Sequence, residues 1–136
     1  MEFIKEFKLA GSETACAPID FVKAVQAELP IFNHVSADKM QTRMKELFES
    51  CHRWEYVVKE GDKTLAIIAL TVDELDPHIG KPVIFPLMAC SLEKGLLRGG
   101  YKWLLELAKE FKFEWILTTR TKDHEITTRY RKVNKG

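Results

Sequence analysis

Three glycines lie close together just before the most amphipathic stretch of the chain. Gly95, Gly99 and Gly100 all fall within Glu93–Gly100, between an apolar segment and a helical pattern. Backbone N–H groups at such a strand-to-helix turn can bind an anion, because glycine allows close approach and the helix dipole favours negative charge. A turn of this composition is therefore able to bind an anion, and it can equally be an ordinary turn with a solvated Arg98.

Residues able to move a proton are scattered along the chain. The candidates for a general base are the carboxylates Glu55, Glu74, Asp76 and Glu93 and the imidazoles His78 and His124. Each of these can equally be an ordinary surface group. Cys90 has no histidine placed to activate it, so we expect a small buried hydrophobic residue. The three cysteines form neither a disulfide framework nor a CxxC zinc motif, and no metal site is predicted.

The chain that must position these residues has 136 residues, which is enough for one domain, 1–136, with its own core. Apolar residues make up 46% and charged residues 30%, a globular balance. The net charge of +1 excludes a strongly basic protein that coats nucleic acid or membranes. No apolar run approaches about 20 residues, and the N-terminus lacks a signal-peptide pattern. We therefore expect a cytoplasmic protein without a membrane partner.

Positive charge is concentrated near the C-terminus. Residues Thr118–Gly136 contain six Lys or Arg and two Asp or Glu, whereas the rest of the chain is mildly acidic. Such a segment can meet an anionic ligand or form a solvated helix face. It shows no interleaving of aromatic and basic residues and no recognised motif, so the sequence does not favour nucleic acid as a partner.

The hydrophobic pattern in the first half predicts a strand, two helices and a hairpin. Residues 3–9 alternate as a strand, and helical spacing follows from Pro18 to Pro30 and again after Ser36, a candidate N-cap. The hairpin consists of Trp54–Glu60 and Thr64–Val72. Its second arm is apolar on both faces, so it should be a central, covered strand.

The second half predicts a strand at Val83–Cys90, in which Pro86 indicates a bulge or a splayed edge. A helix follows from Tyr101, then a strand at Phe113–Thr119 and a final helix at Lys122–Val133. The predicted fold is α/β, a mixed sheet flanked by helices in the order β-α-α-β-β-β-α-β-α. Its last βαβ unit should be parallel and right-handed.

This order, with a glycine turn between the fourth strand and the third helix, resembles the GNAT N-acetyltransferase superfamily over nearly the whole chain. In that family the fourth strand carries a bulge and splays from the fifth, which opens a slot for the pantetheine arm of acetyl-CoA. The resemblance implies that Val83–Cys90 and Phe113–Thr119 are these two strands. It also implies that Leu87, Met88 and Ala89 contact the cofactor.

The family's pyrophosphate-binding turn reads Gln or Arg, two residues, Gly, one residue, then Gly or Ala. Alignment on the helix puts Leu96, Gly99 and Tyr101 at these three positions, and only Gly99 matches. A shift by one residue brings in Gly100 but spoils the helix register. The resemblance implies acetyl-CoA as cofactor, held by Leu96, Leu97, Arg98, Gly99, Gly100 and Tyr101.

The segment Tyr130-Arg131-Lys132-Val133-Asn134 resembles the part of the family's fourth helix in which a tyrosine protonates the departing thiolate of CoA. A phenol with an ordinary pKa of about 10 remains a proton donor at neutral pH. The resemblance thus implies Tyr130 as the catalytic acid. The alternative is that its ring packs on the sheet while its hydroxyl reaches water.

GNAT proteins normally continue after this helix with two more strands, whereas this sequence ends at Gly136. The Phe113–Thr119 strand would then keep an unpaired edge, which a second copy or another protein is expected to cover. The resemblance implies an acetyl-CoA-dependent N-acetyltransferase acting on an unidentified small amine or protein. The alternative is a non-catalytic GNAT-like structural or interaction subunit, such as the shortened domains of some bacteriophage virions.

Overall fold

A computed structural model describes residues 1–133 of the chain; Asn134 of the tyrosine segment, and Lys135 and Gly136 of the basic segment, lie outside the described residues. Six strands form one sheet in the order β1-β2-β3-β4-β5-β6, and every neighbouring pair is antiparallel except β4 and β5. The elements are β1 (Glu2–Lys8), α1 (Ile19–Glu28), the 3₁₀ turn η1 (Pro30–Phe32), α2 (Ala37–Glu49), β2 (Arg53–Glu60), β3 (Lys63–Asp73), β4 (Val83–Ser91), α3 (Arg98–Glu110), β5 (Trp115–Lys122) and β6 (Glu125–Lys132).

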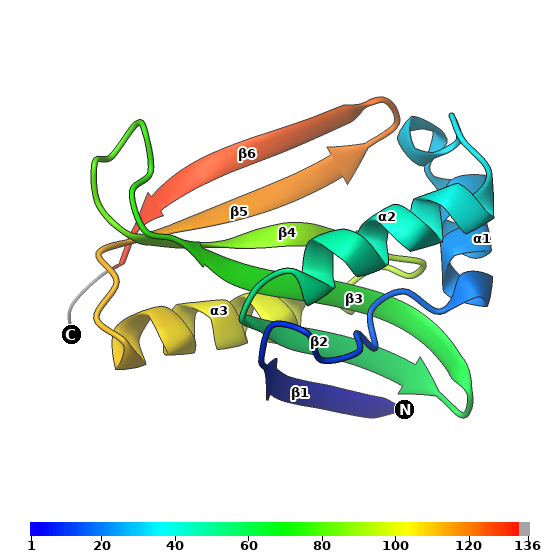
Figure 1. The fold of residues 1–136 in the computed structure, drawn as a ribbon, viewed down its shortest axis with the longest axis horizontal. Coiled ribbons are helices and arrows are strands. Elements are labelled where there is room, and N and C mark those ends of the chain that lie inside the picture. The colour runs from blue at the N-terminus through cyan, green and yellow to red at the C-terminus, as the bar shows by residue number, and fades with distance from the viewer. Residues whose placement is uncertain (134–136) are drawn as a thin grey trace.

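The helices α1 and α2 cover one face of the sheet and α3 covers the other (Figure 1). Pro18 precedes α1 and Pro30 follows it, as their fixed backbone angles favour. Ser36 caps α2, because its side chain accepts a hydrogen bond of 3.2 Å from the backbone N–H of Lys39. Both helix starts and the cap were predicted from the sequence.

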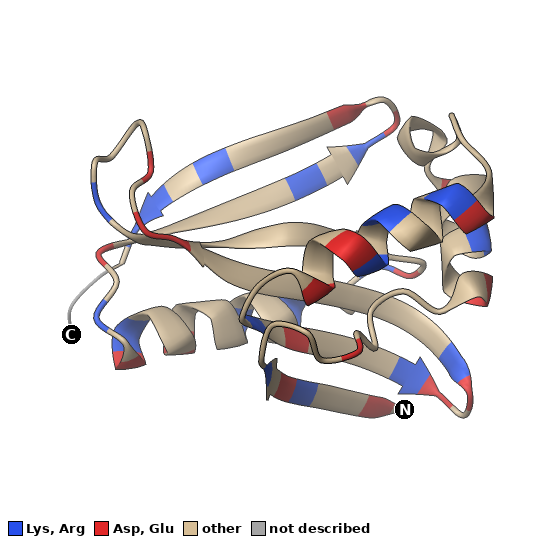
Figure 2. Cartoon of the chain, viewed as in Figure 1, with Lys and Arg blue, Asp and Glu red and all other residues tan. Residues whose placement is uncertain are grey.

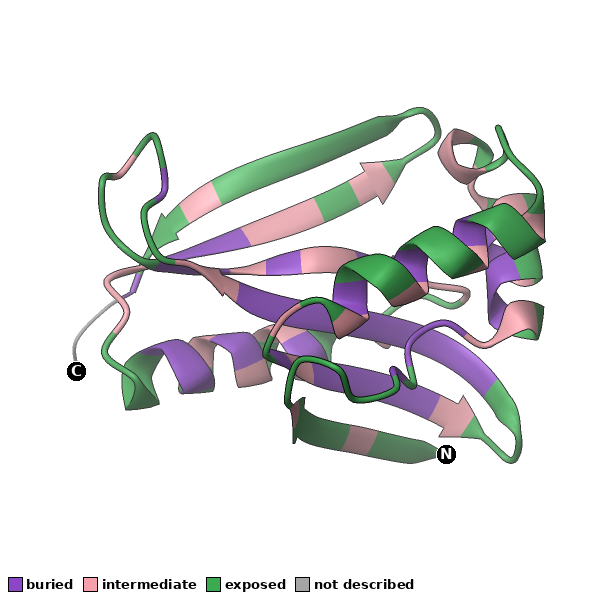
Figure 3. Ribbon diagram, viewed as in Figure 1, coloured by how far each residue is buried: buried purple, intermediate pink, exposed green. Residues whose placement is uncertain are grey.

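β3 is the centre of the molecule, as the sequence predicted. Its residues from Thr64 to Thr71 are buried, so the strand is covered on both faces (Figure 3). Alternate residues of β3 point into two hydrophobic cores, one on each face of the sheet. Ile67 packs with α1 and α2, whereas Ile68 packs with α3. The side chains of this strand therefore join the two layers of helices.

β4 carries the bulge that Pro86 predicted. Ala69 of β3 pairs with Met88 and the next residue, Leu70, pairs with Pro86, which leaves Leu87 without an opposite residue. The bulge also changes the direction of the side chains. Leu87 and Met88 are neighbours in sequence, yet both pack on the side of α1 and α2.

The final helix predicted at Lys122–Val133 is wrong. Residues Glu125–Lys132 form β6, which pairs with β5 through a tight turn at Asp123 and His124. Asp123 adopts a positive φ of 51°, a conformation that asparagine and aspartate tolerate in two-residue hairpin turns. The β-branched run Ile126-Thr127-Thr128 fits an extended strand better than a helix. The observed order is therefore β-α-α-β-β-β-α-β-β.

The predicted need for a partner at the β5 edge is also wrong. β6 pairs with β5 along its whole length, from Trp115 opposite Lys132 to Lys122 opposite Glu125. The backbone groups that another chain was expected to cover are thus paired within this chain. The sheet instead ends at β1 and β6, and both of these strands are largely exposed (Figure 3). Within residues 1–133, no helix has the length and apolar character needed to cross a membrane.

Candidate functional site

The candidate site lies where β4 and β5 part. The two strands are paired at only two positions, Val83 with Trp115 and Ile84 with Ile116. Beyond Ile84 the two ribbons diverge, and β5 continues beside β6 alone (Figure 1). The bulge at Leu87 follows three residues after the last pair. The backbone of β4 facing β5 is therefore free of strand pairing from the bulge to the end of the strand.

Three residues predicted to contact a cofactor line this part of β4. Leu87 and Met88 are half-buried beside the α1–α2 core, and Ala89 is buried on the α3 side. Their side chains are apolar and present no charge or nucleophile. Any ligand between β4 and β5 would therefore meet backbone N–H and C=O groups in apolar surroundings, a setting suited to an amide-containing chain.

The glycine pair lies inside the first turn of α3, rather than in the turn before the helix. A Cβ on Gly100 would lie 2.5 Å from Cδ1 of Ile68 and 2.9 Å from Cδ1 of Tyr56. A Cβ on Gly99 would lie 2.9 Å from the Tyr56 hydroxyl. Both glycines thus allow the start of α3 to approach β2 and β3 closely.

The hydroxyl of Tyr56 occupies part of the predicted anion-binding turn. It donates a hydrogen bond of 2.7 Å to the carbonyl of Leu96 and accepts one from the backbone N–H of Gly100. Burial raises the pKa of this phenol above its ordinary value, and the bond from Gly100 opposes the rise. The cationic side chains of the turn are those of Lys94 and Arg98, which are both exposed, while Leu97 and Gly99 are half-buried.

Tyr101 reaches across the site from the α3 side. Its hydroxyl donates a hydrogen bond of 2.7 Å to the backbone carbonyl of Thr119 on β5. β6 pairs on the opposite edge of β5, so this bond satisfies a carbonyl that would accept a hydrogen bond from an N–H of β4 in a continuous sheet. Tyr101 therefore links the start of α3 to the diverging strand.

Tyr130 lies on β6, opposite Leu117, and not on a helix. Its hydroxyl lies 2.9 Å from Oδ2 of Asp76 and 2.9 Å from Nδ1 of His78. Removal from water raises the pKa of Tyr130, and the neighbouring carboxylate of Asp76 raises it further. The phenol is therefore protonated at neutral pH and donates to Asp76.

Asp76 organises the loop between β3 and β4. One carboxylate oxygen accepts the backbone N–H groups of His78 at 2.8 Å and Ile79 at 3.0 Å, and the other accepts the phenol. Burial alone would raise the pKa of Asp76, but these hydrogen bonds lower it below its ordinary value. His78 points outward, with its side chain 73% exposed. The sequence identified all three residues separately, and only the pairing of β5 with β6 brings them together.

Glu55, one of the candidate bases, is held in a structural network. Its carboxylate accepts hydrogen bonds from Arg53 at 2.7 Å, from the hydroxyl of Thr14 at 2.6 Å and from the N–H of Ala15 at 2.9 Å. Burial opposes ionisation of Glu55, yet these bonds and Lys8 leave its pKa below the ordinary value. Its partners therefore lie on β1, on the loop after it and on β2, and none of them belongs to β4 or β5.

The other candidates do not gather at the site. Glu74, Glu93 and His124 are exposed on separate loops. Cys90 is buried, and burial raises the pKa of its thiol to about 12, so it is inert as predicted. Among residues 1–133, no three His, Cys, Asp or Glu side chains are arranged to hold a metal ion. Comparison of the chain with protein families, curated proteins and solved structures found no match.

Proposed function

We propose that this protein is a GNAT-like acyltransferase that binds acetyl-CoA between β4 and β5 and transfers the acetyl group to an amine. One observation carries the proposal: β4 loses its β5 partner after Ile84 and bulges at Leu87. A sheet that opens beside a bulge presents backbone donors and acceptors to an extended ligand without unfolding a strand. The order of the first eight elements, from β1 to β5 with the 3₁₀ turn left out of the count, also supports this proposal.

The residues of β4 fit acetyl-CoA more closely than those at the start of α3 do. Leu87, Met88 and Ala89 would hold the pantetheine arm through their backbone, and Arg98 would pair with a phosphate at the exposed start of α3. Acetyl-CoA would supply an activated thioester. Tyr56 already uses the N–H of Gly100, so the phosphate would depend on Arg98 and the preceding backbone.

The catalytic role of Tyr130 remains a prediction. Its proton is directed at Asp76, so a role in catalysis requires the hydroxyl to turn from that carboxylate towards a leaving group. The proposed amine acceptor must lose a proton before it reacts, and Asp76 and His78 are the titratable groups nearest to Tyr130. These two residues are therefore the candidates for accepting it.

A second function is favoured by the same contacts. Tyr130 stands on a strand and anchors a loop, and the glycines of α3 pack against a buried tyrosine. A GNAT-like protein without catalytic activity would retain these contacts, because they support the fold. Such a protein would act as a structural or interaction subunit. Such a protein would bind no acetyl-CoA.

Calorimetric titration with acetyl-CoA separates the two functions. We expect saturable binding with one site per chain, and weaker binding by Arg98→Glu, because a carboxylate would repel the phosphates. Lys23→Glu on α1 makes the same change of charge away from the site and should bind as the unaltered protein does. Gly99→Glu is a poorer test, since any side chain there meets Tyr56.

Absence of heat at millimolar acetyl-CoA, with the protein shown to be folded, would reject the acyltransferase and leave the structural subunit. Equal weakening by Arg98→Glu and Lys23→Glu would place the ligand elsewhere. Release of free CoA in the presence of a mixture of small amines then tests transfer itself.

A further inference from the structure

Four basic side chains lie on one face of the β5–β6 hairpin. Residues directly opposite each other in an antiparallel pair point to the same side, and Arg131 is opposite Ile116, which packs in the α3-side core. Counting in steps of two from this pair places Arg120 and Lys122 of β5 and Arg129 and Arg131 of β6 on the α3 side. We refer to Arg120, Lys122, Arg129 and Arg131 as the basic face.

The basic face continues into a groove beside α3. The groove has a volume of about 460 Å³ and lies between Tyr101, Leu105 and Lys109 of the helix and Ile116, Thr118 and Arg131 of the strands. Arg98 and Lys102 precede Leu105 by seven and three residues, so they lie on the same stripe of α3. Cations from the helix thus extend the cations of the hairpin.

These cations are available to a ligand. All four residues of the basic face are exposed, as are Arg98, Lys102 and Lys109. In the part of the chain from 1 to 133, none of the seven forms an ion pair within 4.0 Å of a carboxylate. Glu125, at the turn opposite Lys122, is the one acidic residue that the register places on this face. Figure 2 shows the basic positions on both strands of the hairpin.

The hairpin is held in place along its length. At its turn, the carbonyl of Asp123 accepts a hydrogen bond of 3.2 Å from the N–H of Ile31 in η1. Nearer its base, Thr119 is bonded to Tyr101 and Tyr130 is bonded to Asp76. The cations therefore project from a supported ribbon, so binding would cost little ordering of the backbone.

We propose that the basic face binds double-stranded DNA through its phosphates, without reading the base sequence. Alternate residues of a strand lie about 6.6–6.8 Å apart, so Arg120 with Lys122, and Arg129 with Arg131, form two short parallel rows of cations. A guanidinium group can donate two parallel hydrogen bonds to the oxygens of one phosphate. A two-stranded ribbon of this kind also has dimensions that the major groove admits.

The chemistry of the surface favours a duplex over other anionic partners. The residues between the cations on this face are Thr118 and Thr127, which offer hydroxyl groups to phosphates but no aromatic ring on which an unpaired base could stack. The hairpin turn, Asp123 and His124, has no exposed Trp, Tyr or Phe to anchor it by insertion into a bilayer.

The test uses fluorescence anisotropy of the whole chain with two short labelled duplexes of unrelated sequence. We expect equal affinity for both, in the micromolar range at low salt. The slope of log K against log salt should be about −3 to −4, since each phosphate contact contributes about −0.9. Arg129→Gln with Arg131→Gln should reduce the magnitude of the slope by about 2. Lys23→Gln with Arg43→Gln on α1 and α2 removes the same charge and should leave the slope unchanged.

Four results would overturn the proposal. One is the absence of binding at low salt, and another is equal weakening by the two double variants, which would reveal a diffuse effect of net charge. A third is preference for single-stranded DNA over the duplex. The last is binding to phosphatidylserine vesicles in the absence of DNA binding. Circular dichroism of both double variants confirms that they are folded. The measurement contains no acetyl-CoA, so it does not depend on the proposed acyltransferase.

Discussion

The hydroxyl of Tyr130 joins β6 to a loop more than fifty residues earlier in the chain. Removing it by Tyr130→Phe leaves Asp76 with one partner fewer, while the ring stays in place. We expect the amides of His78 and Ile79 to lose protection against hydrogen exchange by about threefold to tenfold, which is the effect of one hydrogen bond. Exchange followed by mass spectrometry measures this, and amides of β3 serve as the internal control.

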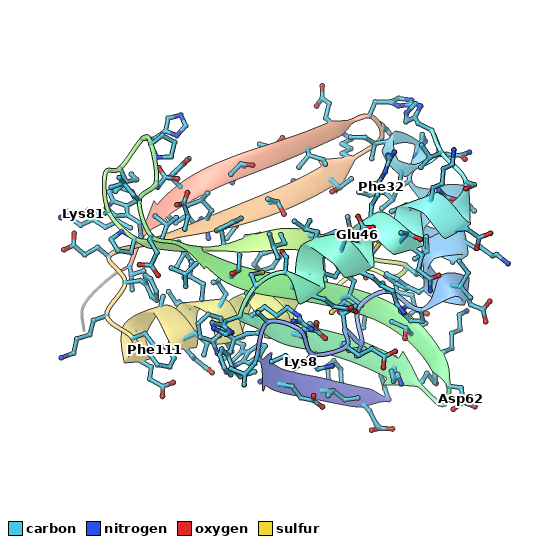
Figure 4. The ribbon with its side chains drawn as sticks, in the orientation of Figure 1. Lys8, Phe32, Glu46, Asp62, Lys81 and Phe111 are labelled. Carbon is cyan, nitrogen blue, oxygen red and sulfur yellow. The ribbon has the colours of Figure 1, made fainter. Side chains whose placement is uncertain are left out.

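A different outcome would assign Tyr130 to catalysis. If loop exchange is unchanged and acetyl transfer falls by about 10²–10⁴-fold, the hydroxyl acts as the general acid that the GNAT resemblance implies. The same variant therefore distinguishes an anchor from an acid. Lys81 (Figure 4) is a suitable comparison, because its ion pair of 2.8 Å with Glu114 ties this loop to the connection just before β5.

The buried pair Arg53 and Glu55 gives a second residue-scale prediction. Both side chains are almost fully buried, and Arg53 also donates to the carbonyls of Ser12 and Leu9. Glu55→Gln leaves the guanidinium without a charge partner, so the free energy of unfolding at pH 7 should fall by about 3–5 kcal/mol. Urea denaturation measures this. Glu46→Gln, on the exposed side of α2, should have no effect (Figure 4).

The effect of Glu55→Gln depends on pH in a direction fixed by its pKa. The pKa of Glu55 is lower in the folded chain than the ordinary value of about 4.3, so its ionised form stabilises the fold above that pH. This contribution is lost as the pH falls through the folded pKa. We therefore expect the difference in stability between the parent protein and Glu55→Gln to shrink below about pH 4. A difference that is constant with pH would contradict the ionised pair.

At the scale of elements, the close contact between α3 and the sheet should reverse the usual effect of replacing a helical glycine by alanine on stability. Glycine to alanine in a helix ordinarily stabilises a protein by about 0.5–1 kcal/mol. At Gly100 the new Cβ would lie 2.5 Å from Cδ1 of Ile68 and 2.9 Å from Cδ1 of Tyr56, so either these side chains or α3 must move. We expect Gly100→Ala to destabilise the fold by about 1–3 kcal/mol in thermal or urea unfolding.

A double-mutant cycle checks this cause. Ile68→Val removes the Cδ1 atom nearest to the new methyl group, so part of the cost of Gly100→Ala should disappear in the combined variant. Tyr56 still limits the space, and the recovery should be incomplete. Strict additivity of the two changes would show that the close approach of α3 to Ile68 is not what excludes a side chain.

For the whole molecule, the distribution of burial predicts a gradient of stability. β3 is covered on both faces, whereas β6 is exposed along nearly its whole length and pairs on one edge alone. We expect β3 amides to exchange only through global unfolding and β6 amides to exchange through local opening of the hairpin. Equal protection in β3 and β6 would mean that another surface covers the hairpin in solution.

Much of the fold was accessible from the sequence, because local signals and burial agree there. Pro18, Pro30 and Ser36 set the limits of helices by their backbone preferences. The doubly apolar run of β3 could be stable only between two layers. Pro86 lacks a backbone donor, so an irregularity in β4 followed from its covalent structure.

Only the tertiary structure decided whether residues 122–133 form a helix or a strand, and therefore which of their side chains lie together. Ile126, Tyr130 and Val133 recur at helical spacing, but pairing with β5 satisfies the backbone of this segment as a strand. In a helix, Arg129 and Arg131 would point about 200° apart, whereas in β6 they share one face. The same change of period brings Tyr130 to Asp76 and His78. Sequence supplied the types of these residues, and long-range strand pairing determined which of them meet.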